Sequence, residues 1–298
     1  MMEKSALRML EKFQKAKTNR VLFESLFEEC YEYAMPMRQS FYYESPGQRR
    51  DDKIFDETAV VGVQEFASRL QSGLVPNFAR WADLLAGSEV PDQNQDDINN
   101  SLDQVTDYVF EIIQNSNFGQ EVHESFMDLA VGTGILLVEE GDAVNPIRFN
   151  AIPLPTVYLD TGPDDKIDHV YRQRSLKYEE IPIAYQKAEL GEKTAKSVAS
   201  NPDAKVDVVE IVCRNYSKPN QDLFDFFVIN IPDKELIFQD QFSGTGSNPF
   251  VCFRWSKASG EIYGRGPLIN ALSAIKTTNL TIELVLENAQ MAISGIYQ

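Results

Sequence analysis

The side chains that most often do chemistry in proteins are few in this sequence, and none has the spacing of a catalytic motif. The two histidines, His123 and His169, stand apart, the first in a segment of helical pattern and the second in one of strand pattern. Isolated histidines of this kind are more often packing or surface residues than general bases or metal ligands. No G-x-x-x-x-G-K-S/T loop and no G-x-S-x-G turn occurs. We therefore predict no catalytic residue and no cofactor, and so a protein that is not an enzyme.

Carboxylates are abundant, and a divalent-metal site that hydrolyses phosphate esters could be built from such groups. The adjacent pairs are Asp51-Asp52, Glu139-Glu140 and Asp164-Asp165. Among 45 acidic residues accidental pairs are expected, and no spacing selects one set, so we predict no metal site. The cysteines, Cys30, Cys213 and Cys252, lie far apart and indicate neither a disulfide framework nor a zinc site. They fit assembly in a reducing cytoplasm.

The charge balance limits the partners that this chain can hold. It has 45 acidic and 28 basic residues, a net charge of −17, and 43% hydrophobic residues among 298, enough to bury a large core. Such a surface disfavours static, high-affinity binding of nucleic acid, because contacts of Lys and Arg with phosphate supply most of that affinity. DNA could still pass close by. No apolar run is long enough for a membrane span, and the N-terminus lacks a signal-peptide pattern.

The elements that must position these side chains follow from hydrophobic periodicity, which predicts an α+β fold with a mainly helical N-terminal part. Helices are expected over Met2–Tyr33, from Asp51 to Leu74, around Ile98–Ile112, around Phe118–Leu129 and over Lys177–Ala188. Strands are expected over Ile135–Val138, Ile147–Ile152, Val157–Asp160, His169–Arg174, Val206–Val212, Leu223–Ile229, Glu235–Phe238 and Phe250–Trp255. Gly191–Lys205 has little apolar content and is expected to be exposed.

The most informative element is a helix expected from Pro267 to Ser294, about 40 Å long, with proline at a favourable first-turn position. Its apolar stripe steps by four and three, with one polar interruption, Asn279. The stripe residues are Leu268, Leu272, Ile275, Asn279, Ile282 and Leu286. A second apolar set, Ile269, Leu280, Leu284 and Met291, lies on another face, so other elements or subunits must surround this helix. Its polar face, with Lys276, Glu283 and Glu287, is either simply solvated or lines a water-filled channel.

Three stretches in order carry a resemblance to a known family. They are Asp52-Lys-Ile-Phe-Asp56, Leu70-Gln-Ser-Gly-Leu-Val-Pro76 followed by Trp81 and Leu84, and Tyr263-Gly264-Arg265-Gly266-Pro267 before the last helix. Together they resemble the portal, or head-to-tail connector, proteins of short-tailed bacteriophages, over essentially the whole chain. That resemblance implies a ring, usually of twelve subunits, at one capsid vertex of the virion, assembled in the host cytoplasm. DNA is packaged and ejected through the ring.

The resemblance also implies a division of the chain. Residues 1–176 would form the wing, 177–205 the first stem helix and a linker, 206–262 the β-rich clip, and 263–298 the second stem helix. Relatives continue into a tunnel loop, a further wing helix and a crown, to which nothing here corresponds, so the chain is expected to be a fragment or to lack those parts. The segment Tyr263–Pro267 would be the junction of clip and stem.

In that arrangement the apolar stripe from Leu268 to Leu286 would pack on neighbouring subunits, while Lys276, Glu283 and Glu287 would face the lumen. The implied partners are other copies of the chain, the major capsid protein, the scaffolding protein, the terminase large subunit, a tail adaptor protein and passing double-stranded DNA, with no membrane. Alternatively, Gly264 and Gly266 only form a helix-entry loop in a monomer. The rival functions are a scaffold or adaptor that binds one partner without closing a ring, and a metal-dependent phosphoesterase.

Overall fold

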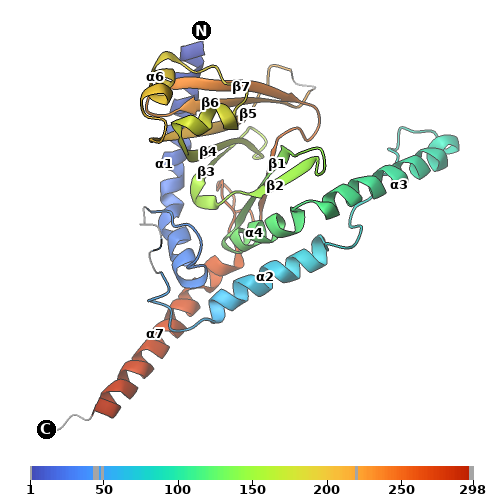
Figure 1. Ribbon diagram of the computed structural model, residues 1–298. Helices are drawn as coiled ribbons and strands as arrows, with labels where there is room; N and C mark the ends of the chain where they lie inside the picture. The colour runs from blue at the N-terminus through green and yellow to red at the C-terminus, as the bar shows by residue number, and fades with distance from the viewer. Residues whose placement is uncertain (1, 43–46, 48–49, 219–220, 295–298) are drawn as a thin grey trace.

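The computed structural model describes residues 2–42, 47, 50–218 and 221–294, and its N-terminal part is helical, as the periodicity predicts (Figure 1). The four helices are α1 (Met2–Ala34), α2 (Thr58–Leu74), α3 (Asp92–Asn115) and α4 (Phe118–Val131). Helix α2 begins later than expected, at Thr58, where the side chain of Asp56 accepts hydrogen bonds from the Thr58 N–H and hydroxyl. Gly132, with φ of 147°, ends α4.

The strands form two antiparallel sheets that confirm an α+β fold. The three-stranded sheet has the order β2 (Ile147–Ala151), β1 (Thr133–Glu140), β8 (Phe250–Arg254). The five-stranded sheet is a meander of β3 (Val157–Thr161), β4 (Ile167–Lys177), β5 (Lys205–Arg214), β6 (Leu223–Asn230) and β7 (Glu235–Ser243). Each strand coincides with one of the runs predicted from β-branched and aromatic residues to within a few residues at each end.

The prediction of a helix over Lys177–Ala188 is wrong. This stretch holds the 3-10 turn η2 (Tyr178–Glu180) and only four residues of α-helix, α5 (Ile181–Ala184). The chain then leaves the helix, and the Glu189 N–H donates to the Ile237 carbonyl of β7 at 2.9 Å. A stem-length helix is therefore not formed here. The exposed stretch that follows carries a short helix, α6 (Glu192–Ser200).

The five-stranded sheet also crosses the boundary predicted between wing and clip. Strands β4 and β5 lie on the two sides of that boundary and pair over nine residues, with Ser175 opposite Asp207. A cut there would separate hydrogen-bonded neighbours in one sheet. The division into wing, stem and clip stays a prediction.

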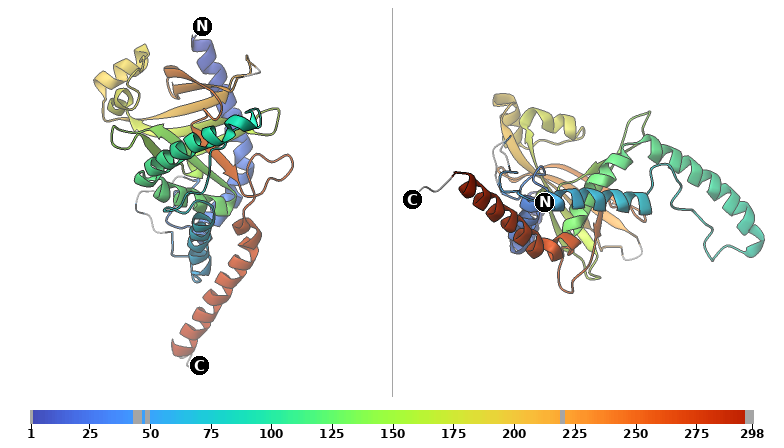
Figure 2. Two further views of the ribbon diagram at one scale, coloured as in Figure 1. Left: turned by 90° about the vertical axis from the view of Figure 1, so that its right-hand side faces the viewer. Right: turned by 90° about the horizontal axis from the view of Figure 1, so that it is seen from below.

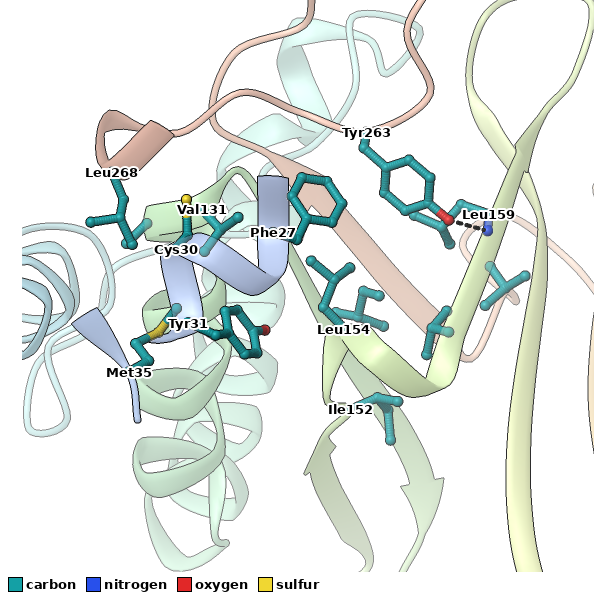
Figure 3. Packing of buried hydrophobic residues seen from close by; sticks show 14 of the residues in the cluster. Phe27, Cys30, Tyr31, Met35, Val131, Ile152, Leu154, Leu159, Tyr263 and Leu268 are labelled. Carbon is teal, nitrogen blue, oxygen red and sulfur yellow. Dashed lines mark hydrogen bonds between the residues drawn. The ribbon is translucent and has the colours of Figure 1, made fainter. Parts of the chain in front are cut away.

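The main hydrophobic core joins helices and both sheets around the C-terminal part of α1 (Figure 3). Phe27 and Tyr31 of α1 meet Val131 at the end of α4, Leu154 of the 3-10 turn η1 (Leu154–Thr156), and Leu268 of α7 (Pro267–Ser294). Next to this core lies a buried polar contact, in which the Tyr31 hydroxyl donates a hydrogen bond to Asp128 at 2.6 Å. Burial raises the pKa of Asp128, whereas the guanidinium of Arg38, 2.9 Å away, opposes that rise.

A buried arginine fastens α1 to the turn between the sheets. Arg20 is 2% exposed, and its guanidinium donates to the carbonyls of Leu154, Pro155 and Val157 at 3.2, 2.7 and 2.9 Å. Its charge is paired with Glu24 at 2.8 Å. The buried charge thus has an acidic partner, and its donors are bonded to the carbonyls around η1.

Two helices, α3 and α7, extend out of the body. Figures 1 and 2 show α3 extending to the side opposite α1, and α7 running away from both sheets to the C-terminal end. Among the described residues, no helix combines the length and apolar character that a membrane span requires. The surfaces of α3 and α7 are thus the parts of the fold that project furthest from the sheets.

Candidate assembly surfaces

The segment Tyr263–Pro267 lies against the end of α4 and the start of β1. The Gly264 N–H donates to the Thr133 hydroxyl at 3.0 Å, and the Gly266 N–H donates to the Val131 carbonyl at 2.7 Å. The Arg265 N–H donates to the Ser256 carbonyl at 2.9 Å. Three successive backbone donors are thus bonded to neighbouring elements, and the segment is anchored along its length.

The glycines of this segment are required by close backbone approach. A Cβ on Gly264 would lie 2.2 Å from the Gly132 carbonyl oxygen, and one on Gly266 would lie 2.1 Å from that of Ala130. Neither distance is compatible with a side chain, and backbone cannot move aside easily. The sequence identified these residues as a junction, and the structure adds that α7 starts in van der Waals contact with the end of α4.

Tyr263 connects the same segment to the five-stranded sheet. Its ring is 1% exposed and packs on Phe23 and Phe27, with ring centroids 5.5 and 5.7 Å apart. Its hydroxyl accepts the N–H of Leu159 in the edge strand β3 at 3.1 Å (Figure 3). Burial raises the pKa of Tyr263, so the phenol stays protonated. The adjacent Arg265 is exposed instead and pairs with Glu261 at 2.6 Å, which lowers the pKa of Glu261.

The first half of α7 packs within its own subunit, which corrects part of the sequence prediction. Leu268 and Leu272 are each 6% exposed in the main core, and Ile275 is half-buried against it. These three side chains were expected to pack on a neighbouring subunit. They are occupied by α1 and the core instead, because α7 begins directly on the end of α4.

Asn279 and Lys276 are likewise engaged inside the subunit. The Asn279 side chain, 6% exposed, accepts the N–H groups of Phe55 and Asp56 at 2.7 and 3.2 Å and donates to the Lys53 carbonyl at 2.8 Å. The Lys276 ammonium pairs with Glu29 of α1 at 3.0 Å. Asn279 is therefore an internal hydrogen-bonding residue, and Lys276 is not an isolated cation.

The second half of α7 extends beyond these contacts with apolar side chains on several faces. Ile282 and Glu283 are half-buried and Glu287 is exposed. The large exposed apolar residues on this half are Leu280, Leu284, Val285, Leu286, Met291 and Ile293. Leu286 of the predicted packing stripe is thus available to another molecule, and so is most of the second apolar set.

A second projecting surface, which we call the arm, consists of residues 76–115. Its non-helical part, residues 76–90, runs back along α3 and is bonded to it. Trp81 packs edge-on against Phe110 with centroids 5.1 Å apart, and Arg80 pairs with Asp103 and Asp107 at 2.5 and 2.9 Å. The Ala86 N–H donates to the Asn99 side chain at 2.8 Å. One side of α3 is thereby covered by its own connecting segment.

The covered side is not the apolar stripe that the sequence shows. Thr106 and Phe110 are buried under the connecting segment, whereas Ile98, Val105 and Val109 of the stripe are 36%, 48% and 37% exposed. Tyr108, at the edge of the stripe, is 64% exposed. Periodicity alone located this stripe, but nothing in the spacing indicated that residues 76–90 would cover the neighbouring side of the helix.

The residues first considered for chemistry do not come together. The Nδ1 of His123 lies 3.1 Å from the Gln71 side-chain oxygen, and the Nδ1 of His169 is buried in β4 without a hydrogen bond to a described residue. Within the described ranges, no three His, Cys, Asp or Glu side chains are grouped as a metal ion would require. Burial raises the pKa of the Cys30 and Cys213 thiols to about 12 and about 11.

The described residues thus present an anchored start of α7 and exposed apolar faces on α3 and α7. The sequence matches the family of bacteriophage head to tail connecting proteins over residues 6–298, and the chain belongs to that family. It is 22% identical over 283 residues to a "Probable portal protein" of Bordetella phage BPP-1, an alignment that covers 90% of this chain and 50% of that protein. The chain thus spans about half the length of this curated relative, and the resemblance inferred from the three sequence stretches is confirmed.

Proposed function

We propose that this chain is a subunit of a phage portal, a ring at one capsid vertex of the virion that acts without catalysis as a conduit for DNA. Its membership of the head to tail connecting family over residues 6–298 is the observation that carries this proposal. We expect twelve copies. The expected partners are the major capsid and scaffolding proteins, the terminase large subunit and a tail adaptor protein, met in the host cytoplasm during assembly.

The physical features of the chain support a passage for DNA. With a net charge of −17, each subunit repels phosphate, so a ring of such subunits would let DNA slide with little adhesion. The second half of α7 carries Glu283 and Glu287, which we place toward the channel. Lys276, the third residue that we expect to face the lumen, has its ammonium paired with Glu29.

The test is to image the purified chain by negative-stain electron microscopy and to measure its mass by light scattering. The expected result is an annulus with a central hole and a mass that is a fixed multiple of 33.8 kDa. A strictly monomeric species at micromolar concentration and low salt would overturn the ring. A discrete complex with one partner and no annulus would favour the adaptor.

A further inference from the structure

The arm is strongly acidic. Residues 76–115 contain eight acidic residues and a single basic one, Arg80. Arg80 is already paired with carboxylates of the arm itself. Asp97 and Glu111 are exposed and make no ion pair within the described part of the chain. The arm therefore carries excess negative charge, with Asp97 next to the exposed stripe of Ile98, Val105 and Val109 and Glu111 further round α3.

The outer face of α1 has the opposite charge and a similar apolar content. In this acidic protein, residues 1–20 contain six basic and two acidic residues. Arg8, Lys15 and Leu22 recur every seven residues and so share one side of the helix. Arg8 and Lys15 are exposed and have no ion pair with a described residue, while Leu22 is 81% exposed. Leu7 and Val21, 44% and 56% exposed, lie on the same outward side.

These two surfaces lie on opposite sides of the subunit. In Figure 1, α1 is at the left edge and the arm extends to the right, and the view from below in Figure 2 agrees. A ring needs two different, complementary surfaces placed in this way, because each subunit must meet one neighbour with each of them. Contacts between two arms, or between two α1 faces, would bring like charges together.

We propose that the arm of one copy docks on the outer face of α1 of the next copy, burying the stripe of α3 against Leu7, Val21 and Leu22. This proposal rests on the proposed ring, and names the contact between its neighbours. Opposite charges at the edge of the contact set its register, while the apolar residues supply the buried area.

Charge reversal tests this contact in the full chain. The arm-reversed variant carries Asp97→Lys and Glu111→Lys, and the α1-reversed variant carries Arg8→Glu and Lys15→Glu. In each variant the four positions 8, 15, 97 and 111 carry charges of like sign across the contact, so we expect its association constant to fall about tenfold or more at low salt. The control, Lys187→Glu with Lys205→Glu, has the same net charge as the α1-reversed variant and should assemble like the unchanged chain. Circular dichroism checks that each variant is folded.

Mixing the two variants gives the sharper result. In an equal mixture the charges at positions 97 and 111 of each arm are opposite to those at positions 8 and 15 of the other variant, so assembly should return, with the two variants in equal amounts. A chain with all four substitutions should also assemble alone. If both variants form rings as the unchanged chain does, or if mixing restores nothing, the docking is wrong although the ring stands. If the unchanged chain forms no ring, the proposed function itself fails.

Discussion

The hydroxyl of Tyr263 allows a prediction that isolates one bond between α7 and the sheet. In Tyr263→Phe the ring keeps its contacts with Phe23 and Phe27, and only the acceptor of the Leu159 N–H is removed. Leu159 is 0% exposed, so water cannot replace the lost oxygen without a local opening. The variant therefore leaves a buried donor unsatisfied in the edge strand β3.

The expected cost follows from that donor. A buried N–H without a partner lowers stability by about 1–3 kcal/mol, and the free energy of unfolding from urea titration should fall by this amount. Local opening should concentrate at β3, so hydrogen exchange of the Leu159 amide should accelerate more than that of the amides of β5 and β6.

The matched control is Tyr108→Phe, which removes a phenol hydroxyl from a side chain that is 64% exposed. Exposed substitutions of this kind change stability by less than about 0.5 kcal/mol. If Tyr263→Phe is as stable as Tyr108→Phe, and the exchange of Leu159 is unchanged, then the hydroxyl does not hold the edge of the sheet. The reasoning on the junction would be refuted.

Three further predictions concern the same region. Gly132→Ala should lower stability by about 2 kcal/mol or more in urea titration, because φ is 147° and the new Cβ would meet a carbonyl 2.1 Å away; Gly73→Ala, with open space around it, should not. Arg265 lowers the pKa of Glu261, so this ion pair stabilises the fold at neutral pH, and the stabilisation is lost as the pH falls through the depressed pKa. The difference in the free energy of unfolding between Glu261→Gln and the unchanged chain should therefore shrink below about pH 4. Burial and the charge of Glu29 raise the pKa of Cys30 to about 12. Mass spectrometry should therefore find this thiol unmodified by an alkylating reagent at pH 8 until urea unfolds the chain. Rapid labelling of the folded chain would contradict the burial of Cys30.

The sequence located the elements well where local signals agreed with packing. Helix α7 was predicted from its first residue onward, because Pro267 starts it and no breaker interrupts the repeat over the described residues to Ser294. The helix predicted over Lys177–Ala188 ends early, because the chain after Pro182 turns to the edge of β7. There the Glu189 N–H donates to the Ile237 carbonyl. A tertiary hydrogen bond overrode local propensity, which periodicity cannot show.

Partners were harder to predict than elements. The repeat of α7 gave the right stripe, but whether Leu272 and Asn279 meet their own chain or a neighbour depends on where α1 and residues 53–56 lie. The stripe of α3 was equally clear in the sequence, yet the connecting segment covers its other side through Arg80 and Trp81. Hydrophobic spacing predicts which face of a helix is buried, but it does not predict which element or molecule covers that face.

The way α7 is held has a mechanical consequence. The helix is bonded to the rest of the chain through Lys276 and Asn279, and its 15 residues from Leu280 to Ser294 continue for about 22 Å. Because Asn279 bonds to backbone at residues 53–56 and Lys276 to Glu29, a load on the tip becomes torque on the end of α1 and the loop before α2. The close contact of Gly264 and Gly266 with the end of α4 holds the start of α7 in place. The tip of α7 is thereby coupled to α1 and to the loop before α2.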